Sequence, residues 1–133
     1  MSFFQYVFDA CSLINIERNK KMTWLRKRKG EVLIPDKVAF EVNQPNSPLH
    51  RFISRYPGIV TQFQNNEEEE YLRIRRQAGI HVGEAAAIAI ALKRNLPLVT
   101  DDKRGKAKAE ELGIKKILTC DEFFKKDMAQ THS

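Results

Sequence analysis

The chain has 133 residues, of which 42% are hydrophobic and 30% charged, a composition typical of one globular domain with its own core. Its 23 lysines and arginines outnumber 17 aspartates and glutamates, and the net charge of +6 favours an anionic partner, most commonly nucleic acid. No apolar run approaches the roughly 20 residues that span a bilayer, the start MSFFQYVFDA lacks signal-peptide features, and the two cysteines show neither metal-ligand spacing nor a disulfide framework.

Taken in chain order, short apolar runs alternate with helical patterns. Strands are expected at residues 3–8, 31–34, 59–63, 96–100 and 114–118. Helices are expected at 10–18, 21–28, 35–42, 49–56, 67–74, 84–94, 104–112 and 121–126. Strands that alternate with helices predict right-handed crossovers, and therefore an α/β fold with helices on both faces of a parallel sheet. We expect one cytoplasmic domain over residues 1–126 and a frayed tail over 127–133.

Three of these helices carry informative residues. The third opens at Pro35–Asp36, and its apolar positions Val38, Phe40 and Val42 leave Glu41 on a flank. The run Glu67–Glu70 opens another helix, and we interpret it as structural, because acids in a first turn complement the helix dipole and basic residues follow. The helix at 84–94 is rich in alanine, which permits close packing on a sheet and predicts a central position.

Acidic residues stand where the expected strands end or helices begin. Asp9 follows the first strand directly, Asp101–Asp102 follow the strand at 96–100, and Glu84 opens the alanine-rich helix. Ligands bind at the carboxyl ends of parallel strands, so we expect these acids at one edge of the sheet, with Glu41 near them. Each acid alone also has a structural explanation: Asp9 as a helix cap, Glu84 as a partner of the dipole, Glu41 as a surface residue.

A cluster of carboxylates points to a divalent cation, because unpaired like charges repel and raise one another's pKa. Oxygen ligands suit Mg²⁺ or Mn²⁺, whereas zinc calls for His or Cys, and His81 alone is weak support for zinc. Such an ion can promote hydrolysis of a phosphodiester, because it polarises the phosphoryl oxygen and lowers the pKa of an attacking water. The candidate substrate-binding residues are Thr100, Lys103 and Arg104. Lys103 and Arg104 can bind backbone phosphates. The hydroxyl of Thr100 can orient a carboxylate or a metal-bound water, and Thr100 can also be simply a β-branched residue at a strand end.

Basic residues gather in five clusters along the chain. Any one cluster is typical of a solvated helix face, and their sum is what favours a polyanionic partner. The clusters are Lys20–Lys21, Arg26–Lys29, Arg73–Arg76, Lys93–Arg94 and Lys103–Lys108.

Four segments in this order, DACSLI, IPDKVAFE, GEAAAIAIAL and LVTDD, closely resemble the PIN-domain nucleases, and within them the small VapC-type toxins of toxin–antitoxin pairs. The resemblance covers roughly residues 5–125. It implies a three-layer α/β/α sandwich around a central parallel sheet, and an acidic Mg²⁺ or Mn²⁺ pocket that cleaves RNA. The metal-holding and catalytic acids would be Asp9, Glu41, Glu84 and one of Asp101 or Asp102. A homodimer and a cognate antitoxin that covers the active site are also implied.

The chain departs from this family at Cys11, where Asn or Ser usually stands two residues after the first acid, and Ser12 follows it. The usual Thr-x-Asp spacing favours Asp102, but some members place the acid directly after the strand, so Asp101 stays a candidate. We expect a ribonuclease acting on tRNA, rRNA or mRNA. The alternatives are a catalytically inactive module that binds RNA or a protein partner, supported by the basic surface and Cys11, and a DNA-directed nuclease, against which the small size argues.

Overall fold

The computed structural model describes residues 4–77, 79–125 and 127, and the elements below are those of this part of the chain. In chain order they are β1 (Tyr6–Phe8), α1 (Ala10–Arg18), α2 (Met22–Lys27), the 3-10 helix η1 (Lys29–Glu31), β2 (Val32–Pro35), α3 (Asp36–Glu41), α4 (Pro48–Arg55), η2 (Pro57–Ile59), β3 (Val60–Thr61), α5 (Glu67–Arg75), α6 (Val82–Arg94), β4 (Leu98–Val99), α7 (Lys103–Glu111), β5 (Ile117–Leu118) and α8 (Cys120–Phe123). Residue 3 of the first predicted strand, residue 126 of the last predicted helix and residues 128–133 of the predicted tail lie outside the described residues.

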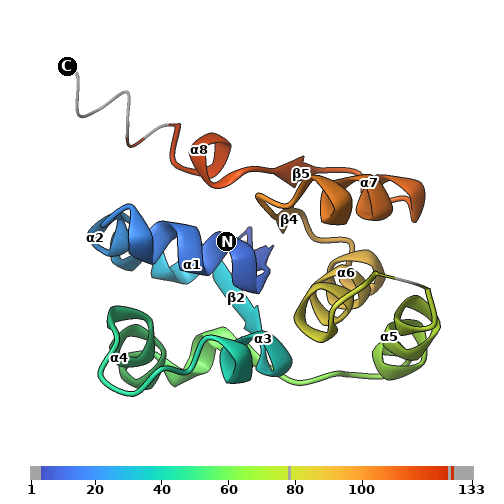
Figure 1. Ribbon diagram of the computed structural model, residues 1–133, viewed down its shortest axis with the longest axis horizontal. Helices are drawn as coiled ribbons and strands as arrows, with labels where there is room; N and C mark the ends of the chain where they lie inside the picture. Colours follow the sequence, from blue (N-terminus) through green and yellow to red (C-terminus); the bar gives the residue numbers. More distant parts are fainter. Residues whose placement is uncertain (1–3, 78, 126, 128–133) are drawn as a thin grey trace.

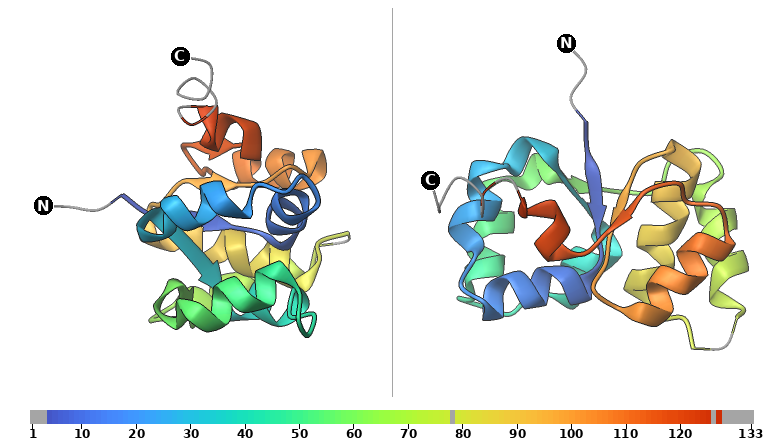
Figure 2. Two further views of the ribbon diagram at one scale, coloured as in Figure 1. Left: turned by 90° about the vertical axis from the view of Figure 1, so that its left-hand side faces the viewer. Right: turned by 90° about the horizontal axis from the view of Figure 1, so that it is seen from above.

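The five strands form one parallel sheet in the order β3-β2-β1-β4-β5. In the centre, Val7 of β1 lies opposite Leu33 of β2 and Leu98 of β4. Successive strand residues point to opposite faces, so these three side chains join one hydrophobic core while Phe8 and Val99 join the other. Helices α1 to α4 and α8 cover one face and α5 to α7 the other, as Figures 1 and 2 show. The predicted three-layer α/β/α sandwich is confirmed.

Local sequence signals account for most element ends. α1 begins after its cap Asp9, as predicted, and Asn95 ends α6 in the left-handed conformation, with φ of 56°. The predicted strand at 96–100 is reduced to β4, since Pro97 has no amide hydrogen and contributes to the ladder only its carbonyl, which accepts from Val7 N at 2.9 Å. None of the described helices is long and apolar enough to cross a membrane.

The apolar positions expected in α3 divide between core and solvent. Val38 and Val42 are buried, whereas Phe40 is 84% exposed. Residues four apart share one face of a helix and the residue between them lies on the other, so the third apolar residue cannot join the same core. Phe40 therefore presents an exposed aromatic ring beside Glu41.

The glutamates that open α5 have a structural role, but their partners differ from those expected. Glu67 and Glu70 are buried, and they pair with α6: Arg94 Nε lies 2.7 Å from Glu67 Oε2, and Lys93 Nζ lies 3.8 Å from Glu70 Oε1. Of the basic residues that follow within α5, Arg73 pairs with Glu70 at 3.2 Å. This cluster joins α5 to the alanine-rich α6, which carries Glu84 at its other end.

Candidate functional site

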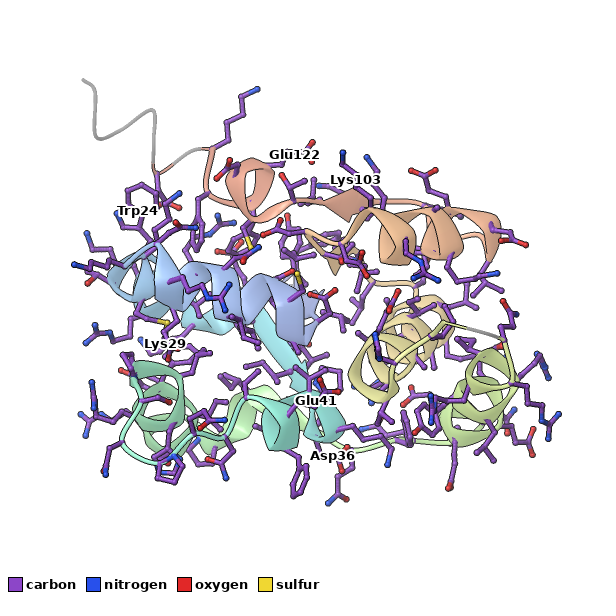
Figure 3. The ribbon with its side chains drawn as sticks, viewed as in Figure 1. Trp24, Lys29, Asp36, Glu41, Lys103 and Glu122 are labelled. Carbon is purple, nitrogen blue, oxygen red and sulfur yellow. The ribbon has the colours of Figure 1, made fainter. Side chains whose placement is uncertain are left out.

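A cavity of about 360 Å³ opens at the carboxyl edge of the sheet, among α1, α3 and α6. Its walls include four of the five predicted acids: Asp9, Glu41, Glu84 and Asp102. Each comes from a different element boundary, and Figure 3 shows Glu41 at the end of α3 and Lys103 at the start of α7 on opposite sides of the N-terminal end of α1. We call this space the acidic cavity.

Asp9 is the most deeply buried of these acids, with 3% of its surface exposed. Its Oδ1 accepts a hydrogen bond from the Ser12 amide at 2.9 Å and lies 2.6 Å from the Ser12 hydroxyl, while its Oδ2 accepts from the Thr100 hydroxyl. Burial raises the pKa of Asp9, and these hydrogen bonds partly oppose that rise. Both oxygens are thus held in fixed directions at the end of β1.

Ser12, and not Cys11 before it, donates to Asp9. The side chain of Cys11 instead lines the acidic cavity, where burial, followed by the charge of Asp9 and the neighbouring acids, raises its pKa to about 11. The thiol is therefore protonated at neutral pH. The departure at this position leaves Asp9 with a hydroxyl and an amide as donors.

Glu84 and Asp102 meet over a glycine in the first turn of α7. A Cβ placed on Gly105 would lie 2.6 Å from Glu84 Oε1 and 3.5 Å from Asp102 Oδ2. Within the described structure, Glu84 Oε1 is buried and has no hydrogen-bond partner. Burial, and then the charges of Asp102 and Asp9, raise the pKa of Glu84. A buried acceptor without a donor lowers the stability of the folded state unless a proton or a cation binds to it.

Glu41 reaches the cavity from the opposite wall. Its carboxylate lies over Gly83 in the first turn of α6, where any side chain would overlap it. The rest of the residue is exposed to solvent at the C-terminal end of α3. Two glycines in first helical turns, Gly83 and Gly105, thus make room for the two glutamates.

The two neighbouring aspartates after β4 have different surroundings. Asp101 Oδ1 accepts from the Cys120 amide and Oδ2 from the Asn15 side-chain amide, both at 2.8 Å, so its carboxylate ties α1 to α8. Asp102 caps α7, with Oδ1 accepting from Arg104 N at 3.1 Å, and its Oδ2 faces the acidic cavity near Glu84. Asp102, and not Asp101, lines the acidic cavity, although the charge of Asp101 also contributes to the raised pKa of Asp9.

The three predicted substrate-binding residues lie in different surroundings. Thr100 is 2% exposed, and its hydroxyl donates to Asp9 and accepts from the Asp102 amide at 3.2 Å. This position suits the alignment of two acids. Lys103 and Arg104 are exposed in the first turn of α7, and the Arg104 guanidinium lies against Gly79, whose φ is 83°.

Sequence reasoning missed four residues of this site. Ser12, Asn15, Arg18 and Gly105 all contact or line it, through the bonds given above or as cavity walls. The helical spacing of Asn15 and Arg18 from Cys11 would have placed them on one face of α1. Glycine is unfavourable inside a helix, so its presence at 105 was itself a signal that space is needed there.

The donor set fits a hard divalent cation, although the carboxylates do not yet surround a common point. In the part of the chain that the structure describes, no three Asp, Glu, His or Cys side chains are arranged to hold a metal ion. The unpartnered Glu84 Oε1 and the raised pKa values of Glu84 and Asp9 show where positive charge would be most stabilising. The four acids that line the cavity offer oxygen ligands, which suit Mg²⁺ or Mn²⁺.

Comparison with known proteins agrees with this arrangement. A family model described as PIN domain matches residues 5–119. Two solved structures are similar over most of the chain. PAE2754 from Pyrobaculum aerophilum has 18% sequence identity and a TM-score of 0.64, and the match covers 95% of this chain and 98% of that one. DNA-bound VapBC from Salmonella typhimurium has 13% identity and a TM-score of 0.60, and the match covers 89% of this chain and 99% of that one. No curated protein matches the sequence. At these identities the structural likeness concerns the fold.

Proposed function

The chain belongs to the PIN-domain family, and from this premise we propose that it is a Mg²⁺- or Mn²⁺-dependent endoribonuclease, the toxin of a toxin–antitoxin pair. The observation that carries the proposal is the convergence of Asp9, Glu41, Glu84 and Asp102 on one cavity at the carboxyl edge of the sheet. The surplus of basic residues elsewhere in the chain suits a polyanionic substrate.

Asp9, Glu84 and Asp102 are the residues that would hold the cation, with Glu41 facing them across the cavity. When bound, a divalent cation polarises a phosphoryl oxygen, eases ionisation of the attacking water and neutralises charge on the leaving oxygen. The support for this assignment is the buried, unpartnered Glu84 Oε1 and the rigid bonding of Asp9.

The remaining residues of the cavity bind and orient the substrate in this proposal. Arg18 lines the acidic cavity and offers a guanidinium to a phosphate beside the scissile bond. Lys103 and Arg104 are exposed on the adjoining first turn of α7 and suit contacts with backbone phosphates. Glu41, the exposed acid of the set, is placed to accept a hydrogen bond from a water that approaches from solvent.

The partner assignments rest on resemblance. RNA is proposed as the substrate because the acid-bearing segments resemble those of VapC-type toxins. A cognate antitoxin and a homodimer are proposed on the same ground, and the likeness to a chain of the VapBC structure supports the antitoxin.

A second function, that of a binding module without catalysis, is supported by the surplus of basic residues and by the departure from the family pattern at Cys11. The test is incubation of the purified protein with tRNA, rRNA and matched RNA and DNA oligonucleotides, in Mg²⁺, Mn²⁺ or EDTA. We expect RNA cleavage that requires metal and is lost in Asp9→Asn. Cleavage that survives this substitution contradicts the site, and salt-dependent binding without turnover in any metal identifies the binding module.

A further inference from the structure

A second cavity, of about 430 Å³, lies between α2 and α4, and its polar walls are arginines. Arg26 comes from α2, and Arg51 and Arg55 come from α4. The apolar part is formed by Met22, Pro48, Phe52 and Tyr56, and among the described residues no acidic side chain lines the cavity. We call this space the arginine cavity. A cavity of this size falls within the range that proteins use to bind small ligands or parts of larger ones.

The positive charge of this cavity is available to a ligand. Among the described residues, neither Arg26 nor Arg55 forms an ion pair, and Arg51 donates one bond to the carbonyl of Asn46 at 2.6 Å. Lys29 Nζ lies 5.3 Å from the centre of the Tyr56 ring and adds a fourth cation at the rim.

Helix dipoles account for part of this arrangement. Arg26 and Arg55 lie in the last turns of α2 and α4, where positive charge is favourable by about 0.3–1 kcal/mol. The dipole gives no reason, however, for three guanidinium groups from two helices to share one hollow without an acid. Guanidinium groups bind phosphate oxygens with paired hydrogen bonds, so the chemistry that fits the hollow is a phosphate or phosphodiester.

Residues that are close in sequence, at the end of α1 and the start of α2, line the two cavities. Arg18, in the last turn of α1, lines the acidic cavity, and Met22, four residues further on, lines the arginine cavity. The nine residues of α1 span about 14 Å, and Figure 1 shows this helix running from the centre of the molecule towards α2 and α4. A polyanion long enough to reach both cavities would meet positive charge at Arg18 in one and at Arg26 in the other.

We propose that the arginine cavity binds the phosphodiester backbone of the RNA substrate at a site separate from the scissile bond. The proposal deepens the proposed function and rests on RNA being the substrate. The gain from this contact would be affinity for RNA long enough to reach both cavities, with no contribution to the cleavage step itself.

The test is RNA binding by the full chain in EDTA, where cleavage is not required, as a function of salt concentration. The double variant Arg26→Gln/Arg55→Gln is compared with Arg76→Gln, an exposed arginine at the end of α5 on the opposite side of the molecule. For a 30-nucleotide RNA, the slope of log affinity against log salt should fall by about 0.7 for each lost phosphate contact, hence by about 1.4 in the double variant. The slope for a 6-nucleotide RNA, and both slopes in Arg76→Gln, should stay at the wild-type values, with unfolding curves confirming the fold of each variant.

An unchanged slope for the long RNA, or an equal loss for both lengths, would overturn the proposal. In that case two further probes, inorganic phosphate and a polyglutamate peptide, identify what the cavity binds. If the double variant keeps the RNA slope but loses phosphate binding, the ligand is a free phosphate. If it loses binding of the peptide instead, the ligand is an acidic protein partner. The experiment distinguishes failure of this proposal from failure of the proposed nuclease function. A reduced slope without RNA cleavage in any metal leaves the backbone site standing and removes the nuclease, whereas cleavage with an unchanged slope does the reverse.

Discussion

The carboxylate of Glu84 fills the space that a side chain at Gly105 would occupy, since a Cβ at that position would lie 2.6 Å from Glu84 Oε1. The acid comes from the first turn of α6 and the glycine from the first turn of α7. Asp102, which caps α7, meets Glu84 at the same point. The glycine thus sets how closely an acid of one helix approaches an acid of the next.

Gly105→Ala should inactivate the protein without unfolding it. The added methyl group displaces the flexible end of Glu84, and a misplacement of about 1 Å in a catalytic group lowers activity by about 100-fold. Alanine is about 1 kcal/mol better than glycine inside a helix, so the free energy of unfolding should be unchanged or slightly higher. The measurements are RNA cleavage rates and denaturant unfolding.

Gly58→Ala is the matched control, because a Cβ there would meet no atom within 4 Å. It should leave the cleavage rate unchanged. Full activity in Gly105→Ala would show that the position of the Glu84 carboxylate does not matter for the reaction.

Ser12→Ala should weaken both stability and activity through Asp9. The Ser12 hydroxyl lies 2.6 Å from Asp9 Oδ1 and 2.9 Å from the carbonyl of Val99, and its single hydrogen serves one of them at a time. A buried carboxylate that loses a donor costs about 1–3 kcal/mol of stability. Because that bond lowers the pKa of Asp9, its loss raises this pKa further, and the acid side of the pH–rate profile should move to higher pH.

Cys11→Ala is the comparison for this variant. Cys11 lies next to Ser12 but lines the cavity without a hydrogen bond to Asp9 in the described structure, so its removal should leave the pH–rate profile in place. If Cys11→Ala moved the profile and Ser12→Ala did not, the support of Asp9 would come from the thiol and our assignment would be wrong.

The fold and half of the site follow from the sequence for one physical reason. Parallel strands present their carboxyl ends at one edge, so an acid directly after β1 and one shortly after β4 are expected to lie close together, and Asp9 and Asp102 both line the acidic cavity. No such rule applies to Glu41, because it is the last residue of α3 and does not follow a strand; its assignment to the metal-holding acids came from family resemblance.

The rest depends on contacts that sequence patterns do not encode. Whether Asp101 or Asp102 faces the cavity is decided by two distant donors, the Asn15 side chain and the Cys120 amide, which hold Asp101 outside it. Phe40 is exposed because it lies two residues from both Val38 and Val42, on the other side of α3, and the apolar run alone does not show which side faces the core.

Glu84→Gln should stabilise the metal-free protein at neutral pH and inactivate it. The pKa of Glu84 is raised above its ordinary value of 4.5 in the folded chain, so the folded state holds this proton more tightly than the unfolded state. Its contribution to stability is therefore fully present below pH 4.5 and is lost as the pH rises through the folded pKa. The neutral glutamine has no such loss, and its melting temperature should exceed that of wild type at pH 7 but not at pH 4.

Mg²⁺ or Mn²⁺ provides the complementary measurement. Either ion should raise the melting temperature of wild type at pH 7 and have little effect on Glu84→Gln, since the cation stabilises the folded state in proportion to its binding. Glu69→Gln, an exposed acid of α5, is the control and should behave as wild type. A metal effect that is equal in wild type and Glu84→Gln would place the cation elsewhere.

Substitution of Asp102 should affect mainly activity, whereas substitution of Asp101 should affect mainly stability. Asp102→Asn keeps the capping oxygen of α7 but removes the charge beside Glu84, so RNA cleavage should fall by about 100-fold or more while stability changes little. Asp101→Ala leaves the Cys120 amide without its acceptor and should cost about 1–3 kcal/mol in the free energy of unfolding, with cleavage retained at temperatures where the variant is folded. Cleavage rates and denaturant curves of the two variants, measured side by side, decide the question. The reverse pattern, an inactive but stable Asp101 variant and an active Asp102→Asn, would mean that the acid directly after β4 is the one that acts.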